Sequence, residues 1–307
     1  MDALAGKNLM NPKVSICIPT YNRRDYLKET LDSVFAQTYK DYEVVIVDDG
    51  STDGTEEMIK SSGYKVRYHR QANAGDAAAR NKLIELAEGK YIAFIDSDDL
   101  LMPDSVERMV KASESAGEDV VVYGPYLRID QVGNITGRSN RRLYSGFITK
   151  QLFENILVHS CGSLFPKRIL EEVGGFNRKL AVCSDYDLWL RLSLRYIFIA
   201  LDEPTFKRRR HSGNLSFRSS DKQIVELRVL EDFYYNKGGA KQIPQNIAEK
   251  RFSRAEYRIA KSAMNERKPA LAAEFFRASF KRRFNIKAFL MWIIALLKLS
   301  VARQAQS

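Results

Sequence analysis

The chain has 307 residues, of which 45% are hydrophobic and 28% charged, a balance that excludes an intrinsically disordered protein. Its length allows one large domain, or one domain with an appended helical segment. The formal charge of +11 is unevenly placed, because residues 207–307 hold 23 Lys and Arg against 8 Asp and Glu, a charge of +15, which leaves −4 for residues 1–206. A basic half of this kind favours an anionic partner: nucleic acid, anionic lipid or a phosphorylated substrate.

Apolar runs and helical patterns alternate through the first 123 residues. Short apolar runs predict buried strands, and apolar residues spaced three and four apart predict the helices between them. Pro103, followed by Asp104 and Ser105, is a helix-start signal. The predicted order is strand 14–18, helix 25–37, strand 43–47, helix 55–61, strand 65–68, helix 76–88, strand 91–95, a helix ending at 116, and strand 119–123. Such alternation predicts a parallel sheet with helices on both faces.

The pattern is less regular after residue 126. Residues 131–134 are typical of a hairpin turn. Helices are predicted over 149–156 and 185–194, and a third begins at Pro166 and ends at the glycine pair 174–175. The polar, serine-rich stretch 212–220 predicts a boundary, so we expect one domain at 12–215 and a helical basic region at 216–307.

Polar side chains follow three of the predicted strands. Strand 91–95 runs into Asp96-Ser97-Asp98-Asp99, strand 43–47 into Asp48-Asp49, and strand 14–18 into Pro19-Thr20-Tyr21-Asn22. Carboxylates cannot stay unpaired inside a buried strand, so they emerge at its end, where ligands bind in open α/β sheets. Clustered carboxylates repel one another unless a cation such as Mg²⁺ or Mn²⁺ lies between them. An acidic turn in solvent is the alternative.

An apolar run, Ala288 to Leu297, lies near the C-terminus and is interrupted by Lys298. A membrane span needs about 20 such residues, so this run is too short to cross a bilayer. Lys281-Arg282-Arg283 and Lys287 precede it, and an apolar stripe beside cations suits a helix lying in a bilayer surface. The alternative is a helix packed on the protein itself or on a second subunit.

The three cysteines, Cys17, Cys161 and Cys183, are spaced neither as a zinc site nor as a disulfide framework. Cys17 falls inside a predicted strand, where it is expected to be a buried apolar residue. Residues 1–11 lack the apolar core of a signal peptide and are expected to form a short lead. These features predict a reducing, cytoplasmic compartment.

The motifs 14–22, 47–53 and 96–99, in that order, resemble the pattern of glycosyltransferase family 2. Each motif alone is unspecific, whereas the ordered set is highly specific, and the resemblance covers residues 12–215. It implies a GT-A fold, an α/β architecture with a mixed sheet flanked by helices, and transfer of a sugar from a nucleotide donor with inversion. The last hundred residues are similar to the helical, often membrane-associated extensions of some members.

The resemblance assigns the donor side to Pro19, Tyr21, Asp49, Arg80 and Asp96. Pro19 and Tyr21 match positions that contact the base and ribose, and an aromatic ring there can stack on a base. Asp49 matches the carboxylate that accepts a hydrogen bond from the base, usually from the ring N–H of uracil. Arg80 matches a donor-site arginine, and an exposed helical arginine is the alternative.

The resemblance also implies a metal, Mn²⁺ or Mg²⁺, held by Asp96 and Asp98 of the D-x-D element, with Asp98 as the more direct ligand. Such an ion neutralises the diphosphate leaving group. His211 matches a late histidine that contacts the metal or the diphosphate, and an exposed loop histidine is the alternative. The neighbouring Arg209 and Arg210 either assist the phosphates or are solvated charges.

Inverting transfer needs a base that takes the proton from the acceptor hydroxyl. Residues 184–191, SDYDLWLR, resemble the family segment E-D-x-D-L-W-L-R, with a serine in place of the usual glutamate. Asp185 matches the base and Asp187 is the second candidate, although a helix-start aspartate can be a simple N-cap. His159, Cys161 and Gly162 are expected to line the acceptor side, where small residues leave room for a sugar.

Two other classes of function compete with this interpretation. A dinucleotide-dependent oxidoreductase requires G-x-G-x-x-G after the first strand, where this chain has Pro-Thr-Tyr-Asn. A non-catalytic scaffold would bind an anionic partner through the basic half without needing Asp98 or Asp185, and no nucleic-acid-binding motif accompanies that half.

We therefore expect an inverting, metal-dependent glycosyltransferase that uses a UDP-sugar or a dTDP-sugar. Its expected acceptor is a saccharide or a lipid-linked saccharide of surface polysaccharide biosynthesis. It is expected to be cytoplasmic and peripheral on the inner face of the cell membrane, held by an anionic membrane surface. A nucleic-acid partner is not expected, and a homo-oligomer is left open.

Overall fold

The computed structural model describes residues 11–117, 119–211 and 219–304, and the chain divides into two compact units. Unit 1 contains the chain up to residue 146 together with 158–176 and 196–210, and unit 2 contains 147–157, 177–195 and the chain from residue 211 onward. The predicted lead, residues 1–11, and the predicted boundary stretch 212–220 lie almost entirely outside the described residues. The domain boundary between residues 215 and 216 therefore stays a prediction.

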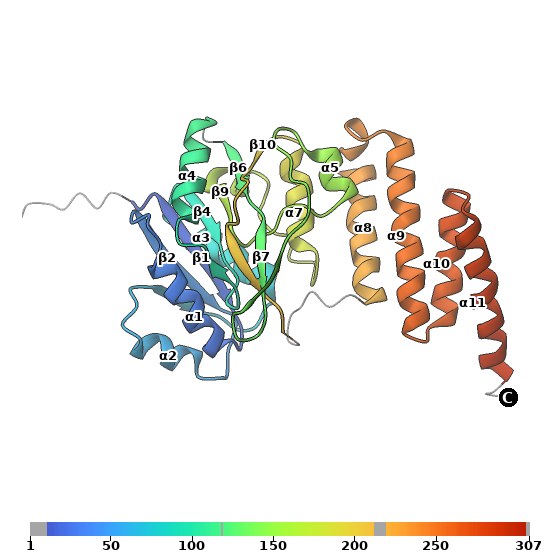
Figure 1. The fold of residues 1–307 in the computed structure, drawn as a ribbon, viewed down its shortest axis with the longest axis horizontal. Helices are drawn as coiled ribbons and strands as arrows, with labels where there is room; N and C mark the ends of the chain where they lie inside the picture. The colour runs from blue at the N-terminus through green and yellow to red at the C-terminus, as the bar shows by residue number, and fades with distance from the viewer. Residues whose placement is uncertain (1–10, 118, 212–218, 305–307) are drawn as a thin grey trace, which may run out of the picture. The chain divides into compact units, whose positions relative to one another are not determined.

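A seven-stranded sheet forms the centre of unit 1, in the order β10-β6-β9-β4-β1-β2-β3 (Figure 1). Its strands are β1 (Val14–Thr20), β2 (Tyr42–Asp48), β3 (Arg67–Arg70), β4 (Tyr91–Phe94), β6 (Val120–Tyr123), β9 (Ser163–Pro166) and β10 (Ile197–Ala200). β1 pairs in parallel with β2 and β4, whereas β9 runs antiparallel to β4 and β6. The expected mixed sheet is confirmed. β1, β2, β3 and β4 run parallel, as the alternation of the first 123 residues predicted, and β9 comes from the less regular part of the chain and is inserted antiparallel.

A second, four-stranded sheet has the order β5-β11-β7-β8. Its strands are β5 (Leu100–Leu101), β7 (Tyr126–Ile129), β8 (Ile135–Arg138) and β11 (Phe206–Arg209). The predicted hairpin turn at 131–134 joins β7 to β8, and Gly133 adopts a φ of +94° there. β5 comes directly after the acidic turn, so its pairing with β11 ties that turn to this sheet.

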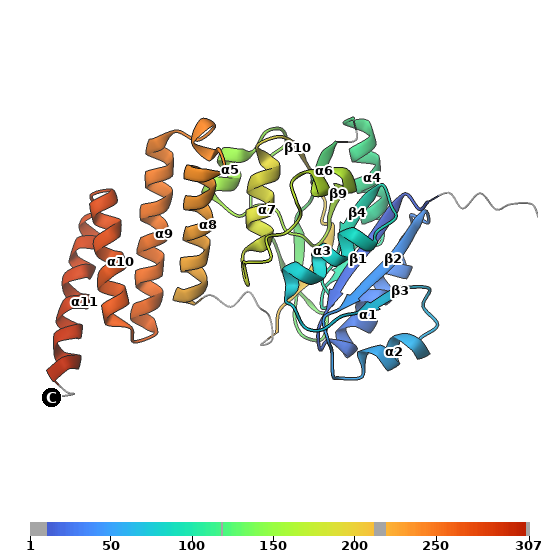
Figure 2. The same ribbon diagram turned by 180° about the vertical axis from the view of Figure 1, so that it is seen from behind.

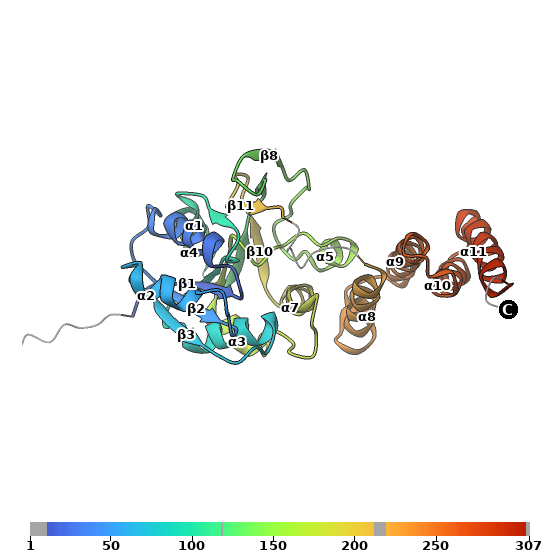
Figure 3. The same cartoon turned by 90° about the horizontal axis from the view of Figure 1, so that it is seen from below.

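Helices cover both faces of the seven-stranded sheet (Figures 1, 2 and 3). They are α1 (Arg24–Phe35), α2 (Thr55–Ser61), α3 (Asp76–Leu86), α4 (Ser105–Ser115) and α6 (Lys167–Glu172). Alternate side chains of β1, such as Ile16, pack with Leu27 and Leu31 of α1 and with Met109 of α4. Each of these side chains is fully buried, which stabilises the fold by about 1.5–3 kcal/mol per residue.

Unit 2 is helical. Its helices are α5 (Thr149–Glu154), α7 (Ser184–Ser193), α8 (Ser220–Asn236), the 3₁₀ turn η1 (Gly239–Lys241), α9 (Gln245–Asn265), α10 (Pro269–Arg282) and α11 (Ile286–Gln304). Helices α8 to α11 lie side by side, each packed on the next (Figure 1). Arg282 of α10 joins three of them, because it contacts Glu231 of α8 and both Glu249 and Glu256 of α9. Among the described residues, no helix combines the length and the apolar character needed to cross a membrane.

Candidate active site

Three neighbouring strands, β2, β1 and β4, bring their carboxyl ends together in unit 1. β1 leads into Tyr21 and Asn22, β2 into Asp49, and β4 into the turn 96–99. Because the three strands are parallel, these polar segments emerge at the same edge of the sheet. The convergence expected from the sequence is therefore present in the fold.

The loop after β1 is fastened to the loop after β2. The backbone N–H of Asn22, which has a φ of +50°, donates to Ser51 Oγ at 2.9 Å, and Asn22 Oδ1 accepts from the backbone N–H of Thr52 at 2.8 Å. Pro19 is buried as part of β1, whereas Tyr21 is 48% exposed. Of the two residues predicted to contact the base and ribose, Tyr21 alone presents a solvent-accessible aromatic ring.

Asp49 organises the loop that precedes α3. One carboxylate oxygen accepts from Gln71 Nε2 at 2.8 Å and from the backbone N–H of Ala74 at 2.9 Å, and the other accepts from the backbone N–H of Gly75 at 2.8 Å. Asp49 itself is 5% exposed. A carboxylate has about four acceptor positions, so three bonds leave one for a donor outside the chain.

Arg80 of α3 is buried between two rings and two carboxylates. Its Nε donates to Asp76, its Nη2 donates to Asp96 Oδ1 at 2.5 Å, and its guanidinium lies 5.6 Å from the ring centroid of Phe94 and 5.7 Å from that of Phe176. Only 5% of Arg80 is exposed, so the alternative of an exposed helical arginine is wrong. Its buried Nη1 has no hydrogen-bond partner among the described residues.

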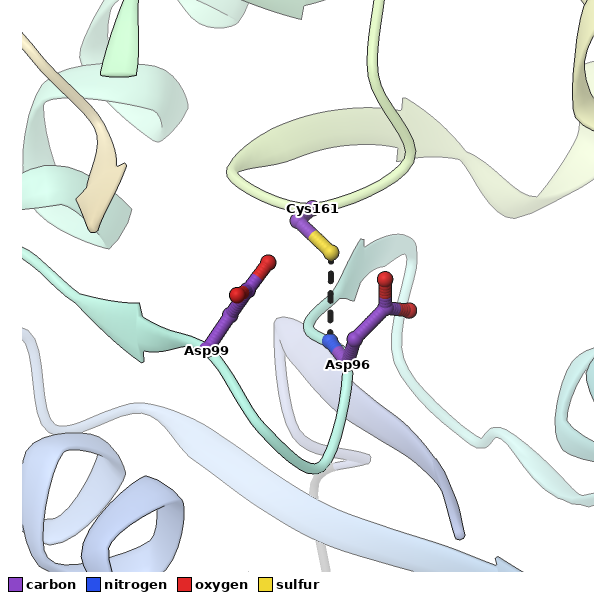
Figure 4. Close-up of side chains that lie close together, drawn as sticks. All are labelled: Asp96, Asp99 and Cys161. Atoms are coloured by element: carbon purple, nitrogen blue, oxygen red, sulfur yellow. Dashed lines mark hydrogen bonds between the residues drawn. The ribbon is translucent and has the colours of Figure 1, made fainter. Parts of the chain in front are cut away.

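The acidic turn after β4 faces Cys161 (Figure 4). The backbone N–H of Asp96 donates to Cys161 Sγ at 3.2 Å, and ligand atoms of Asp96, Asp99 and Cys161 all lie within 4.8 Å of one another. Burial would raise the pKa of Asp96, but the Arg80 guanidinium holds it below its ordinary value. Asp99 differs, because burial and then the charges of Asp96 and Asp98 raise its pKa well above the ordinary value.

Asp96 and Asp99 are the carboxylates of this turn that lie close enough together to share a hard divalent cation, whereas Asp98 is not part of that group. Asp98 lies near Arg23, with 3.8 Å between Oδ2 and Nε, and its side chain is 16% exposed. Oxygen-rich sets of like charge are the ligands that Mg²⁺ and Mn²⁺ prefer. Burial raises the pKa of Cys161 well above its usual value, so its thiol stays protonated and does not suit a hard ion.

Arg209 holds the acidic turn in place, a role that the sequence did not predict. Its backbone N–H donates to Asp99 Oδ1 at 2.8 Å, and its Nε donates to the carbonyl of Asp98 at 3.0 Å. Nη1 donates to the carbonyl of Gln131 at 2.8 Å, and Nη2 pairs with Glu29 Oε2 at 2.6 Å. The Arg209 side chain is 0% exposed, so it is neither a solvated charge nor a phosphate contact of the kind proposed for it.

Two of the predicted acceptor-side residues are part of the packing of unit 1. His159 lies edge-on to Tyr126 with 5.1 Å between ring centroids, and burial lowers its pKa to about 3, so the imidazole is neutral at physiological pH. Gly162 has a φ of +64°, and a Cβ there would lie 2.5 Å from Phe206 and 2.6 Å from Thr205. Packing thus accounts for the glycine, whereas a sugar contact remains a prediction.

The segment that resembles the catalytic-base motif belongs to unit 2. Cys183 occupies the N-cap of α7, so Asp185 lies within the first helical turn and is not the N-cap, and Asp185 Oδ1 accepts from the backbone N–H of Tyr186 at 2.7 Å. Asp187 is buried and forms ion pairs with Arg191 at 2.9 Å and Lys237 at 2.7 Å. The structure therefore gives Asp187 a structural role and leaves Asp185 half-buried.

His211, the third predicted metal contact, is also half-buried and in unit 2.

Comparison with known families identifies the family of this chain. The sequence model described as glycosyl transferase family 2 matches residues 15–174, which is more than half of the chain. The chain belongs to glycosyltransferase family 2. The matched residues include all three strand ends of the site, so the donor-side motifs lie inside the family region.

Two relatives show how far the similarity extends. An uncharacterized glycosyltransferase of Rickettsia felis is 36% identical to this glycosyltransferase over 234 residues, which cover 73% of the chain and 38% of the relative. The chondroitin synthase of Pasteurella multocida is 34% identical over 215 residues, which cover 69% of the chain and 22% of the synthase. The chain thus spans well under half of the length of these two relatives.

The fold of this chain is similar to that of a solved structure. The crystal structure of S. aureus TarS residues 1–349 in complex with UDP-GlcNAc superimposes with a TM-score of 0.57 at 19% identity, covering 92% of this chain and 79% of that one. At this identity the likeness concerns the fold, which is GT-A, as the sequence motifs implied.

Proposed function

We propose that this glycosyltransferase transfers a sugar, with inversion, from a UDP-sugar or dTDP-sugar to a hydroxyl of a saccharide or lipid-linked acceptor in surface polysaccharide biosynthesis. The observation that carries the proposal is the acidic turn 96–99 beside the buried Arg80 at the ends of parallel strands. The UDP-GlcNAc bound to TarS supports a uridine donor, and the named activity of the chondroitin synthase supports a polysaccharide product.

The donor nucleotide would be held by the segments after β1 and β2. The exposed ring of Tyr21 would stack on the base, beside Pro19. Asp49 would use its remaining acceptor position for the ring N–H that uracil and thymine share. Because its other positions are used by the Gln71 side-chain amide and by two backbone N–H groups of the loop before α3, Asp49 is already oriented before the nucleotide binds.

The diphosphate would be held by Arg80 and by a divalent cation on the acidic turn. Asp98 and Asp96 would bind Mn²⁺ or Mg²⁺, with His211 as a further contact, and the bound ion would neutralise the charge of the leaving diphosphate. The unpartnered Nη1 of Arg80 supports a role in binding an anion, since a buried N–H without an acceptor costs about 1–3 kcal/mol.

Asp185 would act as the general base. It would take the proton from the acceptor hydroxyl as that oxygen forms a bond to the anomeric carbon and the bond from that carbon to the diphosphate breaks. Attack opposite the leaving group inverts the anomeric configuration. Asp187 does not suit this role, because its carboxylate is buried in two ion pairs.

The proposal includes a location on the inner face of the cell membrane, where lipid-linked acceptors are held. The charge of +15 on residues 207–307 and the apolar character of α11 support this peripheral location. Unit 2 would supply the contact.

A thermal-shift panel with UDP, dTDP, GDP, CDP and ADP, each with and without Mn²⁺, tests the donor site. A ligand at about 100 times its Kd stabilises a protein by about 2.7 kcal/mol. UDP or dTDP should stabilise the wild type only with Mn²⁺, Asp98→Asn should abolish the shift, and the exposed Asp202→Asn should retain it. If no nucleotide shifts the folded wild type, the donor-site assignment fails and a non-catalytic scaffold is favoured.

A further inference from the structure

Helix α11 carries an exposed apolar stripe formed by five side chains. These are Ile286 (56% exposed), Leu290 (52%), Ile293 (38%), Ile294 (41%) and Leu297 (61%). Their spacing of three and four residues places them on one face of the helix. Phe284, just before the helix, is 79% exposed and adds to the apolar surface.

The opposite face of α11 is already packed on α10. Ala288 and Ala295 are fully buried, and Phe280 of α10 lies 5.4 Å from Trp292 and 5.5 Å from Phe289, measured between ring centroids. These contacts fix the rotation of α11 about its own axis. The exposed stripe therefore faces away from α10 and cannot be the part of α11 that packs within the helical unit.

The charged side chains of α11 and of the residues just before it are all positive. Lys287 and Lys298 are exposed and lie about three turns apart, on the same side of α11, next to Ile294. Lys281 and Arg283 are exposed at the start of the stripe, and no Asp or Glu occurs after residue 274. This face of α11 thus combines apolar side chains with cations and carries no acidic side chain of its own.

We propose that the stripe of α11 docks on an anionic lipid surface, with the helix lying along the membrane interface. This inference rests on the peripheral membrane location included in the proposed function, and it names the surface that makes the contact. A second copy of the chain would bring only like charges to the edges of the same stripe, whereas anionic headgroups complement the lysines and the acyl region takes up the apolar side chains. The 19 residues of α11 are about 28 Å long, so the stripe can lie flat over several headgroups.

Vesicle co-sedimentation of the full chain tests the proposal. The wild type should bind phosphatidylcholine vesicles containing phosphatidylglycerol at low salt, and bind pure phosphatidylcholine far less. Leu290→Ser with Leu297→Ser should weaken binding at least tenfold. Lys287→Gln with Lys298→Gln should weaken it about 25-fold on the anionic vesicles, about fivefold for each cation, and hardly at all on neutral ones.

Two matched controls use residues of the same kind that lie off α11. Val132→Ser alters an apolar side chain that is 80% exposed in unit 1, and Lys261→Gln removes an exposed cation of α9. Both variants should bind vesicles like the wild type. If they lose as much binding as the α11 variants, the stripe is not the docking surface and the proposal is overturned.

The oligomeric state of the same proteins provides the decisive contrast. If light scattering finds a dimer in the absence of lipid, and Leu290→Ser with Leu297→Ser converts it to a monomer, a second copy covers the stripe and the proposal is wrong. All four variants should keep the nucleotide-dependent thermal shift of the wild type. Loss of vesicle binding with that shift intact separates failure of the docking surface from failure of the proposed glycosyl transfer.

Discussion

Replacing Arg209 with Met should destabilise unit 1 and loosen the acidic turn. Methionine keeps much of the apolar bulk but removes every side-chain donor. The bonds to the carbonyls of Asp98 and Gln131 and the ion pair with Glu29 are lost, together with the stacking of the guanidinium 4.9 Å from the ring centroid of Tyr26. The bond from the Arg209 backbone to Asp99 remains, so the strand itself is not broken.

The size of the effect follows from how accessible each partner is. The partly buried carbonyl of Asp98 would be left without its donor, at about 1–3 kcal/mol. Gln131 is exposed and Glu29 is 48% exposed, so water replaces the arginine there and each bond contributes about 1 kcal/mol or less. The stacking on Tyr26 adds about 0.5–2 kcal/mol. The free energy of unfolding should therefore fall by about 1.5–7 kcal/mol, a large share of a typical total of about 5–15 kcal/mol.

Urea unfolding followed by circular dichroism measures this change, because both tryptophans lie in unit 2 and their fluorescence does not report on unit 1. Arg210→Met is the matched control, since Arg210 is exposed and should change stability by no more than about 0.5 kcal/mol. Arg209→Lys keeps one donor and should fall between the two. A loss below about 1 kcal/mol in Arg209→Met, or an equal loss in Arg210→Met, would refute the reasoning.

Three further substitutions test other parts of the structure. Burial would raise the pKa of Glu226, but two arginines of α9 lower it below 4.5. The ionised carboxylate therefore stabilises the fold fully above pH 4.5, and this stabilisation is lost as the pH falls toward the pKa of the folded state. In urea titrations below pH 4.5, the stability of Glu226→Gln should depend less on pH than that of the wild type. Arg282→Met should cost about 3 kcal/mol or more in the same assay, because Glu256 is left buried without its cation, and adding Glu256→Gln should recover part of the loss. Gly162→Ala should lower the free energy of unfolding by about 2–5 kcal/mol, because the residue has a positive φ and the new Cβ would clash with Phe206. Gly174→Ala is the control, since Gly174 has a φ of +78° but open space around it, and it should cost about 1–2 kcal/mol. Thermal unfolding measures both changes.

The sequence predicted well those elements whose own residues show a clear hydrophobic pattern. β1, β2 and β4 are continuous apolar runs, and α1 repeats its apolar residues at helical spacing, so local pattern identified each of them. β9, β10 and β11 are as short as β4 but lie outside the regular alternation of the first 123 residues, and their strand conformation depends on pairing with segments far away in the chain. Tertiary context of this kind is not present in any local window.

The same division applies to the site. The positions of the acidic turn, Asp49 and Arg80 could be located from motifs, since strand ends and acids are local features. The way each side chain is held could not, because Asp49 is held by the loop before α3, and Arg80 is held between two rings that come from β4 and from residue 176. Gly162 illustrates the limit, as its lack of a side chain is required by Phe206, which lies 44 residues further along the chain.

The run Arg208-Arg209-Arg210 shows why composition alone could not assign these roles. β11 ends at Arg209, and alternation along a strand sends neighbouring side chains to opposite faces. Arg209 points to α1 and holds the acidic turn, whereas Arg208 lies over the ring of Tyr126 at 5.8 Å. Burial there would lower the pKa of Arg208, but the charge of Asp99 raises it above its ordinary value. Arg210, beyond the strand, is exposed. Three identical side chains thus have three roles: Arg208 is a cation near the acidic cluster, Arg209 is buried and supports the acidic turn, and Arg210 is a solvated charge. The register of β11 against β5 and β7 determines which arginine takes which role.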